Sequence, residues 1–271
     1  MVPDRNELLE RGSLEHYADA GYYDYTYRAR RDDIEFYRRL ARQHGGPVLE
    51  VGGGSGRVAI PLVQDGVAVT VLDASRPMLA RARERAATQL DAAARKRLTL
   101  CHGDMREFAL RRRFPLVIAP FNVLLHLYEP DEFASCFKSV VKHLAPDGRF
   151  VFDIRVPDVR ELARDPDRRY KARPFRHPTY GHRVEYSEQF RYDPLKQVQH
   201  VTIRFAPEPG TGAPRGSRPV EVLLTQRQIF PNEMRALLAL GGLKLASRYG
   251  DFTGRPLDAD DQQEIIVARK A

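Results

Sequence analysis

The feature that most constrains the fold is a glycine-rich turn between a short apolar strand and a helix. The turn, Glu50–Gly56, places four glycines within five residues, between an expected strand at 47–51 and an expected helix at 55–64. Glycines at such a turn let a ligand approach the backbone closely, and the amides at the helix N-terminus favour anionic groups. The sequence therefore predicts an α/β fold with a small-molecule site at this turn.

Strand-like and helix-like segments alternate along the rest of this region. Apolar strands are expected at 47–51, 67–72, 98–101, 115–119 and 149–154, and amphipathic helices at 55–64, 76–95 and 131–144. Such alternation is typical of a mainly parallel sheet with helices on both faces. A further helix at 231–240 and two strands, 243–248 and 264–268, are expected to close the sheet.

The pattern changes between residues 168 and 230, where long alternating segments rich in Tyr and Val predict antiparallel strands. We therefore expect three parts. They are an N-terminal helical lid (1–45), a core (46–167 and 231–271) and an inserted antiparallel β substrate subdomain (168–230). We expect the insertion to cover the site of the acceptor substrate, and its strands are one candidate surface for a homodimer.

Composition limits the alternatives. The chain has 271 residues and is 42% hydrophobic, enough for a full core, and it contains no apolar stretch of the roughly 20 residues that a membrane span requires. A charged N-terminus without an apolar signal core predicts a cytoplasmic protein with no membrane partner. Cys101 and Cys136 lack metal-ligand spacing, so we expect reduced core thiols and no metal. The net charge of +8 is spread along the chain without a nucleic-acid motif, so we expect no specific nucleic-acid partner.

Three acidic residues lie at or near the ends of successive strands. Glu50 precedes the glycine turn, where a carboxylate would repel a pyrophosphate; this counts against a dinucleotide, although Gly54–Ala59 fits the GxGxxA pattern. Asp73 can accept hydrogen bonds from both hydroxyls of a ribose, or can instead cap the helix that starts near Arg76. Asp104, between Gly103 and Met105, can accept from an adenine amine, or can belong to an ordinary turn.

Together these segments make the chain resemble the class I S-adenosylmethionine (SAM)-dependent methyltransferases. The matching stretches lie between Val48 and Ile154: VLEVGGGSGR, VLDAS with Met78, HGDMREF, PFNVLLHL and LAPDGRFVFDI. The resemblance implies a Rossmann-like seven-stranded sheet with helices on both faces. It also implies SAM as cofactor and S-adenosyl-L-homocysteine as product.

The resemblance also implies roles for individual residues. In the family the glycines line the methionine part of SAM, the first acidic residue lies near its amino group, the second holds the ribose, and the third contacts adenine. The cofactor residues expected here are Glu50, Gly52, Gly53, Gly54, Gly56, Asp73, Ala74, Met78, Gly103, Asp104, Met105 and Pro120. Asn122 is expected near the transfer site, and His126 is a candidate base, although it can equally pack or cap a helix. His177 and His182 are further candidate bases.

The N-terminal segment is rich in tyrosine. Relatives that methylate small molecules often place a lid with a tyrosine near the SAM carboxylate, and Tyr17, Tyr22, Tyr23 and Tyr27 are candidates for this position. Tyr23 is also a candidate for the transfer site. The alternative is a hydrophobic clamp that holds the N-terminal helix onto the core.

The function predicted from these features is SN2 transfer of a methyl group to an N or O atom of a small-molecule acceptor. Three alternatives remain open: an RNA or protein methyltransferase that uses the basic surface, a SAM-binding regulatory protein without catalysis, and a nicotinamide-dependent oxidoreductase. The sequence Pro120–Val123 lacks the NPPY-type motif associated with amino-methylation of nucleic-acid bases.

Overall fold

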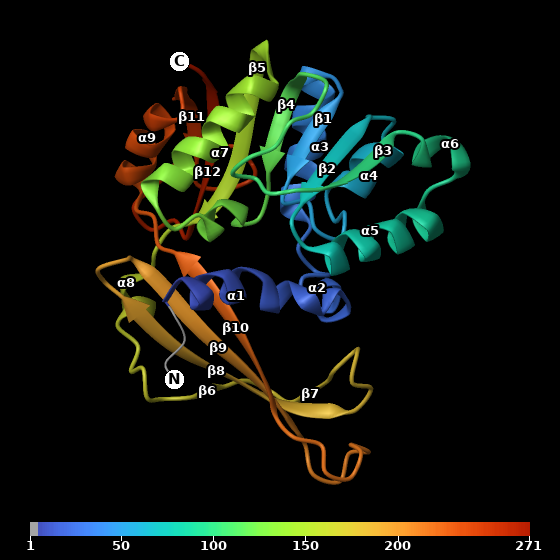
Figure 1. The fold of residues 1–271 in the computed structure, drawn as a ribbon, viewed down its shortest axis with the longest axis vertical. Helices are drawn as coiled ribbons and strands as arrows, with labels where there is room; N and C mark the ends of the chain where they lie inside the picture. The colour runs from blue at the N-terminus through green and yellow to red at the C-terminus, as the bar shows by residue number, and fades with distance from the viewer. Residues whose placement is uncertain (1–4) are drawn as a thin grey trace. The chain divides into compact units, whose positions relative to one another are not determined.

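The computed structural model describes residues 5–271, which form two compact units (Figure 1). The core unit consists of Ala29–Val156 and Ile229–Ala271. The insertion unit consists of Pro157–Gln228 together with the described residues up to Arg28. The helix Asp32–His44, which was expected to belong to the N-terminal lid, belongs to the core unit. The predicted division of roles into lid, core and substrate subdomain stays a prediction.

The core unit is built on one seven-stranded sheet in the order β11-β12-β5-β4-β1-β2-β3. Strand β12 runs antiparallel to both of its neighbours, β11 and β5, and the remaining neighbouring pairs are parallel. This confirms the predicted Rossmann-like sheet. The strands are β1 (Val48–Val51), β2 (Val69–Asp73), β3 (Leu98–His102), β4 (Phe114–Ala119), β5 (Leu144–Arg155), β11 (Leu243–Tyr249) and β12 (Gln263–Lys270).

Helices cover both faces of this sheet (Figure 1). On one face Phe133 and Phe137 of α7 pack with Leu238 of α9, and on the other Phe36 of α3 packs with Ile60 of α4. Each fully buried side chain of this size contributes about 1.5–3 kcal/mol to stability. The core-unit helices are α3 (Asp32–His44), α4 (Ala59–Gln64), α5 (Arg76–Gln89), α6 (Ala92–Arg95), η1 (Val123–His126), α7 (Pro130–His143) and α9 (Pro231–Leu240).

Two predicted helices were wrong in their bounds. The expected helix at 76–95 is divided at Leu90, whose backbone is extended, and Asp91 caps the new helix α6 by accepting from the Ala94 amide. The expected helix at 55–64 begins only at Ala59. Gly56 has φ +76°, and this left-handed backbone extends the turn before the helix can start.

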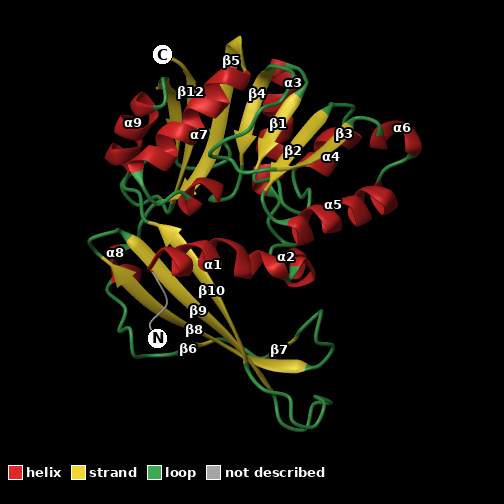
Figure 2. Cartoon of the chain, viewed as in Figure 1, coloured by secondary structure: helices red, strands yellow, loops and turns green. Residues whose placement is uncertain are grey.

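The insertion unit holds a five-stranded antiparallel sheet in the order β10-β9-β8-β6, with β7 also paired to β8 (Figure 2). This confirms the antiparallel strands predicted in this region. Its elements are α1 (Arg5–Ala18), α2 (Ala20–Thr26), α8 (Val159–Leu162), β6 (Tyr170–Lys171), β7 (Phe175–Arg176), β8 (Arg183–Asp193), β9 (Val198–Pro207) and β10 (Val220–Arg227).

Helix α1 packs directly on β10. A Cβ atom at Gly12 would lie 2.3 Å from the Thr225 hydroxyl oxygen, so only glycine allows this approach. The Thr225 hydroxyl donates to the Leu9 carbonyl at 3.2 Å, and the Leu223 amide donates to Glu15 Oε2 at 2.9 Å. Main-chain and side-chain hydrogen bonds therefore fix the helix over this strand. No helix within residues 5–271 is both long and apolar enough to cross a bilayer.

Candidate cofactor site

The glycine turn follows the end of β1. Strands β2 and β4 pair with β1 on its two sides, both in parallel. The chain leaves β1 toward β2 and β3 on one side, while β4 and β5 lie on the other side. In open α/β sheets such a switch point leaves a crevice at the carboxyl ends of the strands, where ligands bind. The topology therefore favours a ligand site beside the glycine turn.

The backbone of the turn is shaped for close approach. Gly52, Gly54 and Gly56 all have φ between +55° and +76°. A Cβ atom at Gly52 would lie 2.0 Å from Val123 Cγ2, and one at Gly54 would lie 2.8 Å from Met78 Cε. Glycine is therefore required at Gly52 by both backbone conformation and space, and at Gly54 by backbone conformation, since the flexible end of Met78 could move.

Asp73, at the end of β2, holds this turn through its carboxylate. Its Oδ2 accepts from the Gly54 amide and its Oδ1 from the Ser75 amide, each at 2.7 Å. Ser75, not Asp73, caps α5, since its hydroxyl accepts from the Met78 amide at 3.4 Å. The interpretation of Asp73 as a helix cap was therefore wrong. A carboxylate has about four lone-pair positions, so two remain for the hydroxyls of a ribose.

Glu50 is a buried carboxylate beside the turn. Its side chain is 2% exposed, and its Oε2 has no hydrogen-bond partner within residues 5–271. Burial raises the pKa of Glu50 to about 8; the Arg57 guanidinium opposes this rise and the Asp73 carboxylate adds to it. A buried oxygen without a partner is costly unless a ligand satisfies it. This environment fits a cationic ligand group such as the ammonium of SAM.

Gly103, Asp104 and Met105 follow β3. The Gly103 amide donates to the Asp73 carbonyl at 3.1 Å, which places this turn next to that of β2. Burial would raise the pKa of Asp104, but the Arg106 guanidinium, 2.6 Å from its Oδ2, holds it below its usual value. Met105 is half-buried against the core. The predicted adenine contact of Asp104 stays a prediction, and Arg106 is a partner that the sequence did not indicate.

The loop after β4 carries two of the predicted catalytic residues. Beyond Pro120, Phe121 and Asn122 have φ of 64° and 62°, an uncommon conformation for residues other than glycine. Asn122 Oδ1 accepts from the Arg155 amide at 2.6 Å, so the side chain joins the ends of β4 and β5. His126 ends η1 and is half-buried. Both lie on loops at the same edge of the sheet as the glycine turn.

Similarity to known proteins agrees with this geometry. A family model described as a methyltransferase domain matches residues 48–148. Residues 48–148 are therefore similar to a methyltransferase domain, which agrees with the resemblance to the class I SAM-dependent enzymes. SAM is the cofactor of this family, and the cradle formed by Glu50, the glycines and Asp73 fits it.

Individual relatives extend the similarity beyond the methyltransferase domain. The dTDP-3-amino-3,6-dideoxy-alpha-D-glucopyranose N,N-dimethyltransferase of Streptomyces fradiae is 34% identical over 42% of either chain, so the match spans less than half of that relative. The cypemycin N-terminal methyltransferase of a Streptomyces species is 28% identical over 83% of this chain and 84% of its own. The CcbJ methyltransferase of Streptomyces caelestis is 27% identical, with a TM-score of 0.72 over 89% of both chains.

The core unit also contains a buried polar network that sequence reasoning missed. The Tyr37 hydroxyl donates to Asp153 Oδ1 at 2.7 Å, and the Phe121 amide donates to the same oxygen at 2.9 Å. The Asp153 carbonyl accepts from the Asn122 amide at 3.0 Å. Asp153 therefore holds the strained Phe121–Asn122 turn from both its side chain and its backbone. The only sequence signal was a carboxylate within the apolar run FVFDI.

A second part of this network anchors the residue after the glycine turn. Arg57 binds Asp33 through two hydrogen bonds, of 2.8 and 2.6 Å, and Arg30 Nε binds the same carboxylate at 2.9 Å. Although burial would raise the pKa of Asp33, the two guanidinium groups hold it below its usual value. Arg30 also contacts Asp153 at 3.3 Å, which joins the two parts. Asp33 lies in the first turn of α3, where the helix dipole favours a negative charge. In the sequence this carboxylate is therefore explained without any ion pair.

The predicted tyrosines belong to the insertion unit, where they surround His16. The ring centroids of Tyr17, Tyr22, Tyr23 and Tyr27 lie 5.2–6.4 Å from that of His16. Tyr22 is buried and stacks on His177, which stacks in turn on Tyr180 at 3.9 Å. These contacts pack the tyrosines within the insertion unit, and the predicted clamp onto the core stays a prediction. The roles of the tyrosines in cofactor binding or methyl transfer stay predictions. So do the roles of His177 and His182 as bases.

The two cysteines are free thiols. Cys136 is buried in the core and Cys101 is half-buried. Burial raises the pKa of the Cys101 thiol, which keeps it protonated near neutral pH. Within residues 5–271 no group of His, Cys, Asp and Glu side chains is arranged to hold a metal ion.

Proposed function

We propose that this protein is a SAM-dependent methyltransferase that modifies an amine or hydroxyl of a small-molecule acceptor. The observation that carries the proposal is the Glu50 carboxylate, which is buried beside the glycine turn with Oε2 unsatisfied within residues 5–271. The ammonium of SAM would satisfy this oxygen and favour the ionised form of Glu50, whereas a phosphate beside it would favour the protonated form. We assign the hydroxyls of the ribose to Asp73, which lies on the neighbouring strand.

The chemistry needs little from the protein beyond positioning. When bound, SAM supplies a methyl group on a positively charged sulfur, which passes to the lone pair of the acceptor in one SN2 displacement. The chain must orient the acceptor in line with this group and exclude water. We assign this orienting role to the loop after β4, whose shape Asp153 fixes through Phe121 and Asn122.

Proton removal is the second task. An amine acceptor that is protonated must lose a proton before its lone pair can react, and a hydroxyl acceptor must lose its proton during transfer. His126 is the residue that we propose for proton acceptance, with Asn122 and Tyr23 as orienting groups. We favour nitrogen over oxygen, because both curated relatives named above act on amino groups.

The insertion unit is the part that we propose selects the acceptor. The two curated relatives act on very different amines, an amino sugar and a peptide N-terminus. Acceptor choice must therefore depend on parts other than the shared cofactor domain. Localisation in the cytoplasm and a homodimer through the inserted strands belong to the same proposal.

Two measurements on the full chain test this function. Thermal unfolding is recorded with SAM, S-adenosylhomocysteine, NADH or no ligand; a ligand at 100 times its Kd stabilises the fold by about 2.7 kcal/mol. Stabilisation by both adenosyl ligands supports the proposal, and stabilisation by NADH alone would replace it with an oxidoreductase.

The second measurement follows consumption of methyl-labelled SAM with amino sugars and with short peptides. Turnover of either acceptor supports small-molecule methylation. SAM binding with no consumption across both classes would favour the non-catalytic binding protein. Tight, strongly salt-dependent binding of RNA would instead favour the nucleic-acid alternative.

A further inference from the structure

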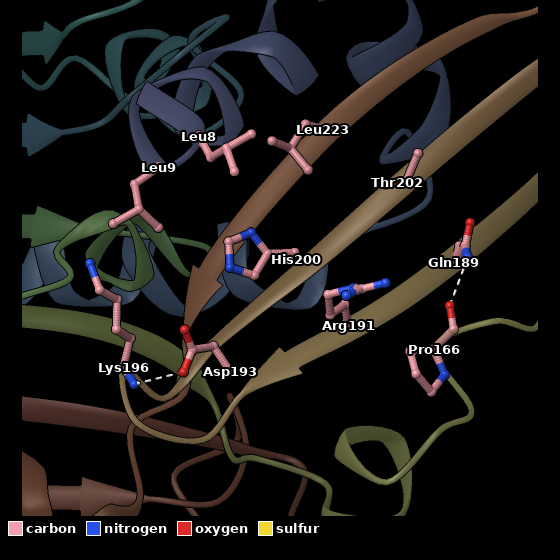
Figure 3. A pocket seen from close by; sticks show the side chains of 10 residues that line it. All are labelled: Leu8, Leu9, Pro166, Gln189, Arg191, Asp193, Lys196, His200, Thr202 and Leu223. Atoms are coloured by element: carbon pink, nitrogen blue, oxygen red, sulfur yellow. Dashed lines mark hydrogen bonds between the residues drawn. The ribbon is translucent and has the colours of Figure 1, made fainter. Parts of the chain in front are cut away.

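One face of the insertion sheet contains a pocket with a volume of about 340 Å³ (Figure 3). Its walls come from α1, β8, β9, β10, the turn after β8 and the loop at Pro166, all within the insertion unit. None of these residues belongs to the cofactor site. The lining residues are Leu8, Leu9, Pro166, Gln189, Arg191, Asp193, Lys196, His200, Thr202 and Leu223.

Strand register places the polar residues of the pocket side by side. Arg191 of β8 lies directly opposite His200 of β9, and Gln189 lies opposite Thr202. Side chains alternate between the two faces of a strand, so these four share one face. The alternate positions, including Phe190, Val201 and Ile203, form the apolar core on the other face. A polar floor on one face is therefore a consequence of the period-two pattern.

Helix α1 covers only part of this polar face. It is fixed over β10 by the contacts of Leu9 and Glu15 with that strand. Leu8 and Leu9 of α1 and Leu223 of β10 border the pocket, while Arg191, His200 and Thr202 reach it from β8 and β9 (Figure 3). The pocket thus has an apolar wall beside a polar floor, as sites for small organic ligands commonly do.

The charge of the pocket is positive. Neither Arg191 nor Lys196 has a side-chain ion pair within residues 5–271. Asp193 is the one carboxylate among the lining residues, and its Oδ1 already accepts the amides of Leu195 and Lys196. In contrast, Arg204 on the same face of β9 pairs with Glu221 at 3.7 Å. Two cations without an acidic partner favour an anion at this position.

His200 lies between these groups. Burial lowers the pKa of its imidazole; the Asp193 carboxylate opposes this shift, and the Arg191 and Lys196 cations increase it. On α1, Glu15 already accepts from the Leu223 amide and pairs with Arg11. The ring is therefore neutral near pH 7, and an anion bound beside it would favour its charged form.

We propose that this pocket binds the phosphate or carboxylate group of a small molecule. Arg191 and Lys196 supply the charge, His200 and Thr202 supply hydrogen bonds, and the leucines contact the apolar part of the ligand. Binding at this pocket requires neither SAM nor methyl transfer, so the proposal stands independently of the function proposed above.

The test is an NMR titration of the His200 imidazole in the full-length protein without SAM. Inorganic phosphate and succinate are the two probes, and His200→Gln identifies the signal among the eight histidines. We expect a saturable shift and a raised pKa of His200 with at least one probe. The response to phosphate or to succinate alone tells which oxyanion the pocket prefers.

Two charge-neutralising variants locate the site. Arg191→Gln should weaken binding by roughly tenfold or more, as expected for loss of a charge-assisted hydrogen bond. Arg204→Gln removes the same charge from the same sheet outside the pocket, and should leave binding within about twofold. If Arg191→Gln loses native near-UV dichroism, Lys196→Gln replaces it. No saturable change with either probe, or equal affinity in the Arg191 or Lys196 variant, would overturn the proposal.

Discussion

Asp73 Oδ2 accepts a 2.7 Å hydrogen bond from the Gly54 amide, and this bond joins the ends of two neighbouring parallel strands. The other oxygen of the same carboxylate accepts from the Ser75 amide, also at 2.7 Å. Asp73 thus shapes the glycine turn and α5 together. Its carboxylate determines both the local structure and the group offered to a ribose.

Replacing Asp73 by Asn should lower both the stability of the protein and its affinity for SAM. An amide has one oxygen, so one of the two backbone donors would face an NH2 group, at a cost of about 1–3 kcal/mol. We expect SAM affinity to fall by roughly tenfold or more, as for loss of a hydrogen bond to a charged group. The measurements are urea unfolding and the thermal shift with SAM. Asp91→Asn is the control, because Asn caps α6 as well as Asp does; equal effects of the two variants would contradict this role.

Glu50 should make both stability and SAM binding depend on pH. Its pKa is raised from 4.5 to about 8 in the folded protein, so the folded state holds a proton that the unfolded state releases. This contribution to stability is fully present below pH 4.5 and is lost as the pH rises through about 8. We expect the unfolding free energy of the wild type, minus that of Glu50→Gln, to fall between pH 4.5 and about pH 8.

A cationic ligand should reverse this trend. The ammonium of SAM would pair with the ionised carboxylate, so the extra stabilisation by SAM should increase with pH in the wild type and not in Glu50→Gln. Unfolding midpoints at pH 5–9, with and without SAM, supply the measurement. Parallel curves for the two proteins would show that Glu50 does not face the ligand.

Gly52 and Gly45 form a matched pair for the glycine turn. Their φ values are +67° and +73°, but a Cβ atom at Gly52 would meet Val123 Cγ2 at 2.0 Å, whereas one at Gly45 would meet nothing within 4 Å. Gly45→Ala should therefore cost only the backbone strain, about 1–3 kcal/mol for a φ of 73° with a ψ of 175°, a conformation essentially confined to glycine. Gly52→Ala should cost more, by about 1–3 kcal/mol of overpacking against Val123, and should lower SAM affinity. Denaturant unfolding and SAM titration distinguish the two; a Gly52→Ala variant that behaves like Gly45→Ala would contradict the close packing.

Loss of the buried carboxylate of Asp33 should lower the free energy of unfolding far more than loss of a surface carboxylate. Asp33→Asn removes the carboxylate that Arg57 and Arg30 share, and breaking a buried pair typically costs about 3–5 kcal/mol. Asp65→Asn, which removes the partly exposed pair with Arg38, should cost about 1 kcal/mol or less. Urea unfolding of the two variants gives the comparison. Similar losses would mean that the buried network contributes little.

Local patterns were enough to predict the parallel sheet, the inserted antiparallel strands and the position of the cofactor turn. Each depends on residues close together in sequence: a strand of apolar residues, glycines that adopt positive φ, and an acidic residue after the next strand. Glu50 could be singled out because it directly precedes the glycine turn, and Asp73 because it ends the next strand. The break at Leu90 was missed, because Asp91 is a helix cap that lies within an otherwise continuous helical pattern.

Tertiary structure alone decided what each carboxylate contacts. Tyr37 and Asp153 are 116 residues apart, and Asp33 and Arg57 are 24 apart, yet both pairs meet in the buried core. The polar pocket likewise depends on the register that sets Arg191 opposite His200. Sequence periodicity fixes which face of an element is apolar, because that depends on backbone geometry within the element. Which polar groups then meet depends on how elements far apart in sequence pack, and only the folded chain brings them together.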